Sequence, residues 1–300
     1  MDITARIYND EDAAREHIEA IRWPNGPVCP HCNGDRVSVF GGKSMGPGWH
    51  HCNDCRLKFT VRVGSIYERS KIPLHKWVLA THLIASSKKG ISAHQLHRML
   101  GITYKSAWFM AHRIRESMRE FAPDPVGGAN KVVEVDETYV GGKAKNRAFK
   151  EPPKKEAVVA LVERGGKVRS HHVPKVTSRV VGTIINQQIE QASYIMTDES
   201  TVYPGATAGF GGHGTVNHSI KEYVRGGFWH TNTIENYFSI LKRGIYGTYE
   251  AVSEKHLKRY LGEFDFRYNT RDVSDFERAA MAMKGAAGKR LTYRRAGVGA

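Results

Sequence analysis

The amino-acid sequence predicts an α/β domain, a mixed sheet with flanking helices, that follows two small modules at the N-terminus. Three observations support this prediction. In the second half of the chain, short runs of β-branched and apolar residues alternate with segments of helical periodicity. All four cysteines lie within the first 55 residues. Between these two parts, residues 73–121 have a continuous helical pattern.

The N-terminal module is indicated by the cysteines, which form two C-x2-C pairs separated by nineteen residues: Cys29, Cys32, Cys52 and Cys55. This spacing is typical of a zinc ribbon, in which four thiolates hold one structural Zn²⁺. Two disulfides are an alternative, disfavoured because the charged N-terminus is not a signal peptide. A redox C-x-x-C is a second alternative, disfavoured by the presence of two pairs at ribbon spacing. We therefore expect an N-terminal helix and a zinc ribbon over residues 1–66.

The second module, residues 67–121, contains a segment similar to a helix-turn-helix, ISAHQLHRMLGITYKSAWFMAHRIRESM. Gly101 is suited to end its first helix in the left-handed conformation, and Thr103 can cap the second helix. The second helix is expected to present four DNA-binding residues, Tyr104, Lys105, Arg113 and Arg115. An ordinary αα-hairpin with a solvated basic face is the alternative.

The charge balance favours a polyanionic partner. Lys and Arg total 45 against 30 Asp and Glu, giving a net charge of +15. Basic residues gather after residue 142, where Lys143 and Lys145 are expected to contact DNA, and in a basic C-terminal tail, residues 273–300. The sequence has no apolar run long enough to span a bilayer, so we expect no membrane partner and a cytoplasmic, nucleoid-associated protein.

Three acidic residues stand out in the second half of the chain, after a Pro- and Gly-containing linker at residues 122–130. Asp136 and Asp198 each end a predicted buried strand, in VVEVD and YIMTD. Glu235 lies on a predicted helix, with Lys242 two turns further along. Such carboxylates can converge on two Mg²⁺ or Mn²⁺ ions, because hard divalent ions prefer oxygen ligands.

The order of predicted elements over residues 131–272 is strand, strand, strand, helix, strand, helix. With acids on the first strand, the fourth strand and a later helix, this is the order of an RNase H-like domain. Glu134 and Glu137 flank Asp136, and since neighbours along a strand alternate between faces, only one set faces the site. His230 is either a hydrogen-bond partner near the site or a core histidine, and for a lone histidine the core position is the favoured interpretation.

At this point the chain resembles the DDE insertion-sequence transposases of bacteria and archaea that carry an N-terminal zinc ribbon. The resemblance rests on VDETYVGGK, TDES, HTNTIENYFSILKRGIYGTY and SEKHLKRYLGEFDFRYNTR, and it extends to about residue 272. It implies an RNase H-like domain that binds two divalent metal ions, cuts the element's ends and joins their 3′-hydroxyls to target DNA. It also implies that Asp136, Asp198 and Glu235 are the catalytic acids.

Lys242 matches a basic residue of this family that contacts DNA phosphate, and we expect the same of Arg243. Some relatives have Asn at the third catalytic position, and Asn232 lies one turn before Glu235. We favour Glu235, because a carboxylate binds Mg²⁺ better than an amide does. The expected partner is double-stranded DNA, both terminal inverted repeats and target, bound by a homodimer or larger assembly. The rivals are a non-catalytic zinc-ribbon and helix-turn-helix regulator, and a structure-specific RNase H-like nuclease.

Overall fold

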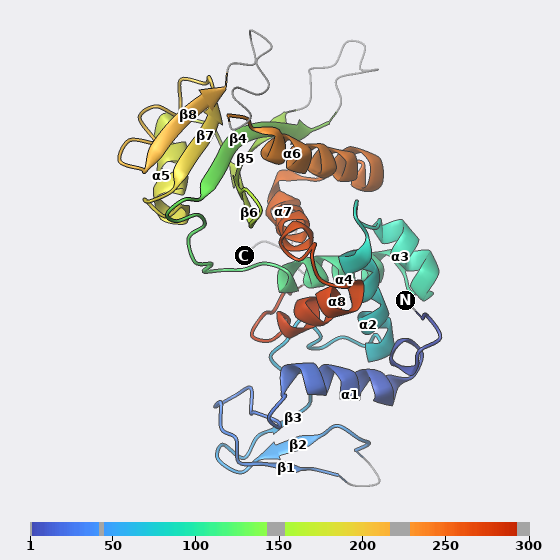
Figure 1. The fold of residues 1–300 in the computed structure, drawn as a ribbon. Helices are drawn as coiled ribbons and strands as arrows, with labels where there is room; N and C mark the ends of the chain where they lie inside the picture. The colour runs from blue at the N-terminus through green and yellow to red at the C-terminus, as the bar shows by residue number, and fades with distance from the viewer. Residues whose placement is uncertain (1, 42–44, 143–153, 217–228, 293–300) are drawn as a thin grey trace, which may run out of the picture. The chain divides into compact units, whose positions relative to one another are not determined.

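The computed structural model describes residues 2–41, 45–142, 154–216 and 229–292 (Figure 1). The chain divides into two compact units. The ribbon unit comprises Met1–Arg119 together with Val273–Ala300, and the sheet unit comprises Glu120–Asp272. The chain therefore leaves the ribbon unit once, builds the sheet unit, and returns.

The ribbon unit begins with the turn η1 (Arg6–Tyr8) and helix α1 (Glu11–Arg22). Three short strands follow, β1 (Val37–Val39), β2 (His50–Cys52) and β3 (Lys58–Phe59), which form an antiparallel sheet in that order. Two of the cysteines and one aromatic ring form its buried core: Cys29, Cys52 and Phe59. The predicted N-terminal helix and small β-ribbon are thus present.

The described residues of the ribbon unit form four further helices: α2 (Leu74–Ser86), α3 (Ala93–Leu100), α4 (Tyr104–Ser117) and α8 (Asp275–Lys284). Helix α3 ends at Gly101, whose φ of 58° is left-handed, and the Thr103 side chain accepts the Ser106 N–H at 3.2 Å to cap α4. Both helix limits predicted for the helix-turn-helix segment are confirmed.

Helix α8 lies where the sequence suggested a basic tail. Ser274 and Glu277 form a capping box at its start, each accepting the other's backbone N–H. Its buried residues include Ala282 and Met283, and the helix contacts α2. The expectation of a tail is therefore wrong for residues 275–284, because a well-capped amphipathic helix packs here.

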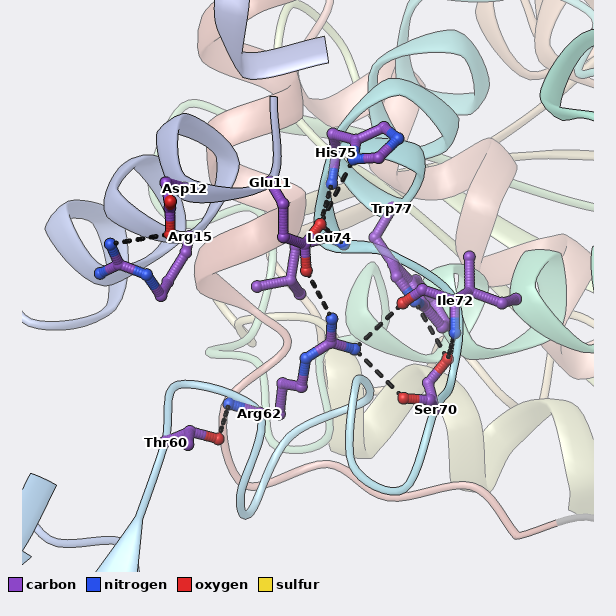
Figure 2. A network of polar contacts seen from close by, with 10 residues as sticks. All are labelled: Glu11, Asp12, Arg15, Thr60, Arg62, Ser70, Ile72, Leu74, His75 and Trp77. Carbon is purple, nitrogen blue, oxygen red and sulfur yellow. Dashed lines mark hydrogen bonds and ion pairs between the residues drawn. The ribbon is translucent and has the colours of Figure 1, made fainter. Parts of the chain in front are cut away.

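Helix α2 receives its N-terminal cap from α1, because its own N-cap residue is a proline without a capping side chain. Glu11 accepts the Leu74 N–H at 2.5 Å (Figure 2). The other Glu11 oxygen accepts from Arg62 at 2.8 Å, and Arg62 also donates to the carbonyls of Ser70 and Ile72. A carboxylate at this end satisfies an orphan N–H and complements the helix dipole.

The sheet unit contains a five-stranded sheet in the order β6-β5-β4-β7-β8. Its strands are β4 (Val132–Gly141), β5 (Lys155–Glu163), β6 (Val168–Val173), β7 (Tyr194–Asp198) and β8 (Gly212–Val216). Strands β4, β5 and β6 form an antiparallel meander, whereas β7 runs parallel to β4 and β8 parallel to β7. The predicted RNase H-like mixed sheet is confirmed.

Helices cover both faces of this sheet. Helix α5 (Ser178–Gln188) packs on one face, and α6 (Asn232–Gly244) and α7 (Glu254–Asn269) pack on the other; a π-helical turn, η3 (Ile245–Tyr249), follows α6. Alternate residues of β5 enter the two cores, Val159 toward α5 and Val158 toward α6. Burial on both faces explains the unbroken apolar run in β5.

Residues 122–130, expected to be a linker, belong to the sheet unit. Val126 is buried, and its N–H and C=O pair with the backbone of Gln188 and Glu190 at 2.8 and 2.9 Å. The Pro and Gly content of this segment therefore marks an irregular but packed connection. Over the described part of the chain, no helix has the length and apolar character that crossing a membrane requires.

Candidate active site and metal centres

Asp136 and Asp198 lie at matching positions of neighbouring parallel strands. Strand β4 pairs with β7 in a register that includes Glu134 opposite Met196, and the same register continued by two residues brings Asp136 beside Asp198. Both aspartates are half-buried. Even-numbered residues of β4 point to the face covered by α6, as Val140 does. The structure thus brings two of the three predicted acids together on one face.

The electrostatics of Asp136 are those of a crowded acidic site. Burial is the main cause that raises the pKa of Asp136 to about 8, and the carboxylates of Asp198, Glu137 and Glu235 raise it further. The Glu137 backbone N–H opposes this effect by donating to Asp136 Oδ1 at 2.7 Å. A divalent cation among these carboxylates would favour the charged form, so the group has the electrostatic character of a cation site.

Glu235 lies in the first turn of α6, on the same face of the sheet, and its side chain is exposed. The Thr231 hydroxyl donates to Glu235 Oε1 at 3.3 Å. Asn232, also exposed, lies one turn upstream. The three carboxylates, all of them among the described residues, do not form a group with ligand atoms all within 4.8 Å of one another. The negative charge of Glu235 nevertheless raises the pKa of Asp136.

The flanking acids have distinct surroundings. Glu137 points to the α5 face, where it accepts a hydrogen bond from the Tyr203 hydroxyl. Glu134 shares the face of Asp136 and is fully buried, with His230 Nδ1 at 3.3 Å from its Oε1. His230 is thus a polar partner of Glu134 and not an apolar-core histidine. Glu137 thus lies on the opposite face from Asp136, as strand alternation predicts, whereas Glu134 lies on the same face as Asp136.

Two basic residues of α6 lie on its exposed side. Lys242 and Arg243 are exposed in the last turn, and Arg243 donates to the Ser239 hydroxyl at 2.7 Å. Their position at a helix C-terminus also complements the helix dipole. Lys143 and Lys145 lie outside the described residues.

The four cysteines form the other predicted centre. All four are free, and their Sγ atoms lie within 4.8 Å of one another, with Cys29–Cys55 at 3.7 Å and Cys32–Cys52 at 3.6 Å. Tetrahedral Zn²⁺ with Zn–S bonds of about 2.3 Å requires S–S separations of about 3.8 Å. The cluster therefore fits a four-thiolate zinc site, and the separations are too long for the disulfide alternative.

The DNA-binding residues predicted on α4 separate into two pairs. Tyr104 and Lys105 are exposed at the start of the helix, where the Tyr104 ring stacks on His94 at 4.1 Å. Arg113 and Arg115 are buried, so the prediction that α4 presents them to DNA is wrong. Arg113 instead binds backbone carbonyls within the ribbon unit, those of Ile66, Glu68 and Leu291.

One further group of potential metal ligands lies in the sheet unit: Glu156, His172 and Glu254. The Lys154 ammonium is 3.3 Å from each of the two glutamates, and His172 Nε2 is 3.0 Å from Glu156. Because a protein cation already balances these carboxylates, the group is an ion-pair network.

Comparisons with known proteins identify two domain families in this chain. Residues 9–58 match the transposase zinc-ribbon domain family, and residues 127–269 match the ISXO2-like transposase domain family. An uncharacterized protein in transposable element ISH50 of Halobacterium salinarum is 26% identical over 280 residues, covering 87% of this chain and 92% of that protein.

Two solved structures show weaker similarity. The Mos1 transposase paired-end complex with left transposon end gives a TM-score of 0.28 at 9% identity, covering 70% of this chain and 74% of that one. The Drosophila P element transposase strand transfer complex gives 0.26 at 11% identity, covering 67% and 58%. The two domain families together establish that the chain belongs to the insertion-sequence transposases that carry a zinc ribbon before a DDE domain.

Proposed function

We propose that the protein is a DNA transposase that cleaves DNA at the ends of its element and joins the 3′-hydroxyl ends to target DNA. One observation carries this proposal. Asp136 and Asp198 lie side by side on the sheet face covered by α6, the helix that bears Glu235. The raised pKa of Asp136, about 8, supports it, because the cause is burial among like charges. Membership in the transposase family supports the same reaction.

The three carboxylates suit Mg²⁺ or Mn²⁺, which prefer oxygen ligands. In this proposal Asp136, Asp198 and Glu235 would together hold the catalytic ions. Such ions supply charge stabilisation at the scissile phosphate and activate the attacking hydroxyl. Asp136 must lose its proton before it can bind, which makes ion binding pH-dependent. Structural Zn²⁺ would be held separately, by the four cysteines.

DNA contacts are proposed on both units. Lys242 and Arg243 are exposed on the same helix as Glu235, where they can bind backbone phosphate and orient the scissile strand. Tyr104 and Lys105 stand at the exposed start of α4, the end of a recognition helix that reads base edges. Because the reaction joins two element ends, we propose that a dimer or larger assembly acts on DNA.

The test is Mg²⁺-dependent cleavage and strand transfer on DNA that carries the element's own ends. Wild type is compared with Asp136→Ala and with Asp272→Ala, a control that removes an exposed carboxylate at the end of the sheet unit. We expect joined products from wild type and the control, and none from Asp136→Ala. Cutting without joining would identify a nuclease, and DNA binding without metal-dependent chemistry would identify a regulator; either result would overturn the proposal.

A further inference from the structure

We propose that Glu134 is a positioning residue that sets the place of Glu235 relative to Asp136. The inference rests on the proposed function, since it assigns a role in the same carboxylate site. Glu134 is buried, and it is neither a proposed metal ligand nor a proposed DNA contact.

Helix α6 lacks a cap from its own N-terminal residue. The N-cap Thr231 makes no side-chain capping bond, and its hydroxyl donates to Glu235 instead. A helix start leaves backbone N–H groups without partners, which must be satisfied from elsewhere. Glu134 of β4 supplies this partner: its Oε2 accepts the Ile234 N–H at 2.9 Å, and its Oε1 accepts the Thr233 hydroxyl at 3.0 Å.

The same carboxylate is held firmly from the other side. Glu134 is fully buried, and Arg164, at the end of β5, donates from Nε to its Oε1 at 2.6 Å. Arg164 also donates to the His230 carbonyl at 2.6 Å, which fixes the chain just before α6. A buried carboxylate with a charged partner and several donors keeps one geometry, because losing any partner leaves an unsatisfied buried group.

The hydrogen bonds of Glu134 lie next to the proposed carboxylate site. Glu134 is two residues before Asp136 on one strand and faces the same side. Ile234, which it binds, immediately precedes Glu235. A single carboxylate therefore ties the backbone beside one proposed metal ligand to the backbone beside another. Since protein donors hold both of its oxygens, Glu134 acts through Glu235 and is not itself a ligand.

The effect of substitution distinguishes a purely structural cap from a positioning residue, because only a positioning residue should alter metal binding. Glu11 provides the matched case, because it caps α2 in the ribbon unit and pairs with Arg62 in the same way. Replacing either glutamate by glutamine removes a charged helix cap. Only the change at Glu134 should alter metal binding in the sheet unit.

The experiment is calorimetric titration of the zinc-loaded full-length protein with Mn²⁺, with helicity followed by circular dichroism. We compare wild type, Glu134→Gln, Glu11→Gln, Asp136→Ala and Thr233→Val, the last removing only one donor to Glu134. For Glu134→Gln we expect a Kd for Mn²⁺ raised about 10-fold or more, the usual cost of losing a group that orients a ligand. Thr233→Val should raise the Kd by a smaller factor, and Glu11→Gln should leave it unchanged.

Wild-type Mn²⁺ affinity in folded Glu134→Gln would overturn the proposal. So would the loss of one whole ion equivalent in that variant, because Glu134 would then be a ligand. If Glu134→Gln does not fold, Thr233→Val decides, and an unchanged Kd there overturns the inference. Failure of the proposed function looks different: Asp136→Ala would then bind Mn²⁺ as wild type does, or wild type would bind none.

Discussion

At the scale of single residues, the protonation of Asp136 links folding to metal binding. Its pKa rises from an ordinary 3.8 to about 8, first because of burial and then because of Asp198. Between these two values the folded protein holds a proton that the unfolded chain has lost. The stability that this group contributes is therefore fully present below about pH 4 and is lost as the pH rises through about 8.

This loss of stability with rising pH gives a prediction for Asp136→Asn in the metal-free protein. Near pH 8 the variant should melt at a higher temperature than wild type, because it removes a buried charge; each kcal/mol gained is worth roughly 2–4 °C at this size. Below pH 5 the difference should shrink. Thermal unfolding at several pH values, with and without Mg²⁺, measures this, and Mg²⁺ should stabilise only the wild type. A variant that melts lower than wild type at pH 8 would contradict the assignment.

At the scale of elements, short sequence patterns correctly predicted helix ends, because these depend on residues that are close together in the chain. Gly101 and Thr103 predicted the turn between α3 and α4, because a left-handed residue and a capping hydroxyl act within a few residues. The side of α4 that packs was not predictable in this way. Its arginines lie on a helix with apolar and basic residues on several faces, and the carbonyls that bind Arg113 come from distant segments.

The same reasoning explains why the role of Glu134 could not be predicted. Its bond to Ile234 joins residues 100 positions apart, and no spacing within VVEVDE indicates it. Asp136, Asp198 and Glu235 stood out because each lies on a recognisable strand or helix pattern. Sequence patterns thus indicated the acids at the site, whereas the residue that holds the helix required the packed structure.

Arg113 and Lys105 were both predicted to bind DNA, but Arg113 is buried and Lys105 is exposed, so their substitutions should have different effects. Arg113→Ala should destabilise the ribbon unit by roughly 2–3 kcal/mol, because charge-assisted bonds to backbone carbonyls are lost in a buried setting. Lys105→Ala should leave stability unchanged and weaken DNA binding, with the salt slope reduced by about one. Chemical denaturation and binding at several salt concentrations measure both effects. Equal losses of stability in the two variants would refute the distinction.

At the scale of the whole molecule, the ribbon unit is built from both ends of the chain. Residues before 120 form most of it, and α8 returns after the sheet unit is complete. Helix α8 buries Ala279, Ala282 and Met283 and contacts α2. Beyond it, the Lys289 ammonium donates to the Ser117 carbonyl at 3.1 Å, at the end of α4. The C-terminal segment is therefore part of the unit that carries the four-cysteine cluster and helices α3 and α4.

Removal of residues 273–300 should for this reason destabilise α2, although α2 lies almost 200 positions earlier in the chain. We expect the truncated chain to lose protection from hydrogen exchange in α2, because the apolar surface that α8 covers becomes exposed. The sheet unit should keep its protection and its Mn²⁺ binding, since all of its strands lie within Glu120–Asp272. Hydrogen exchange followed by mass spectrometry compares the two units in one sample. Unchanged protection in α2 would mean that residues 273–300 are an accessory tail, and loss confined to the sheet unit would contradict the division of the chain.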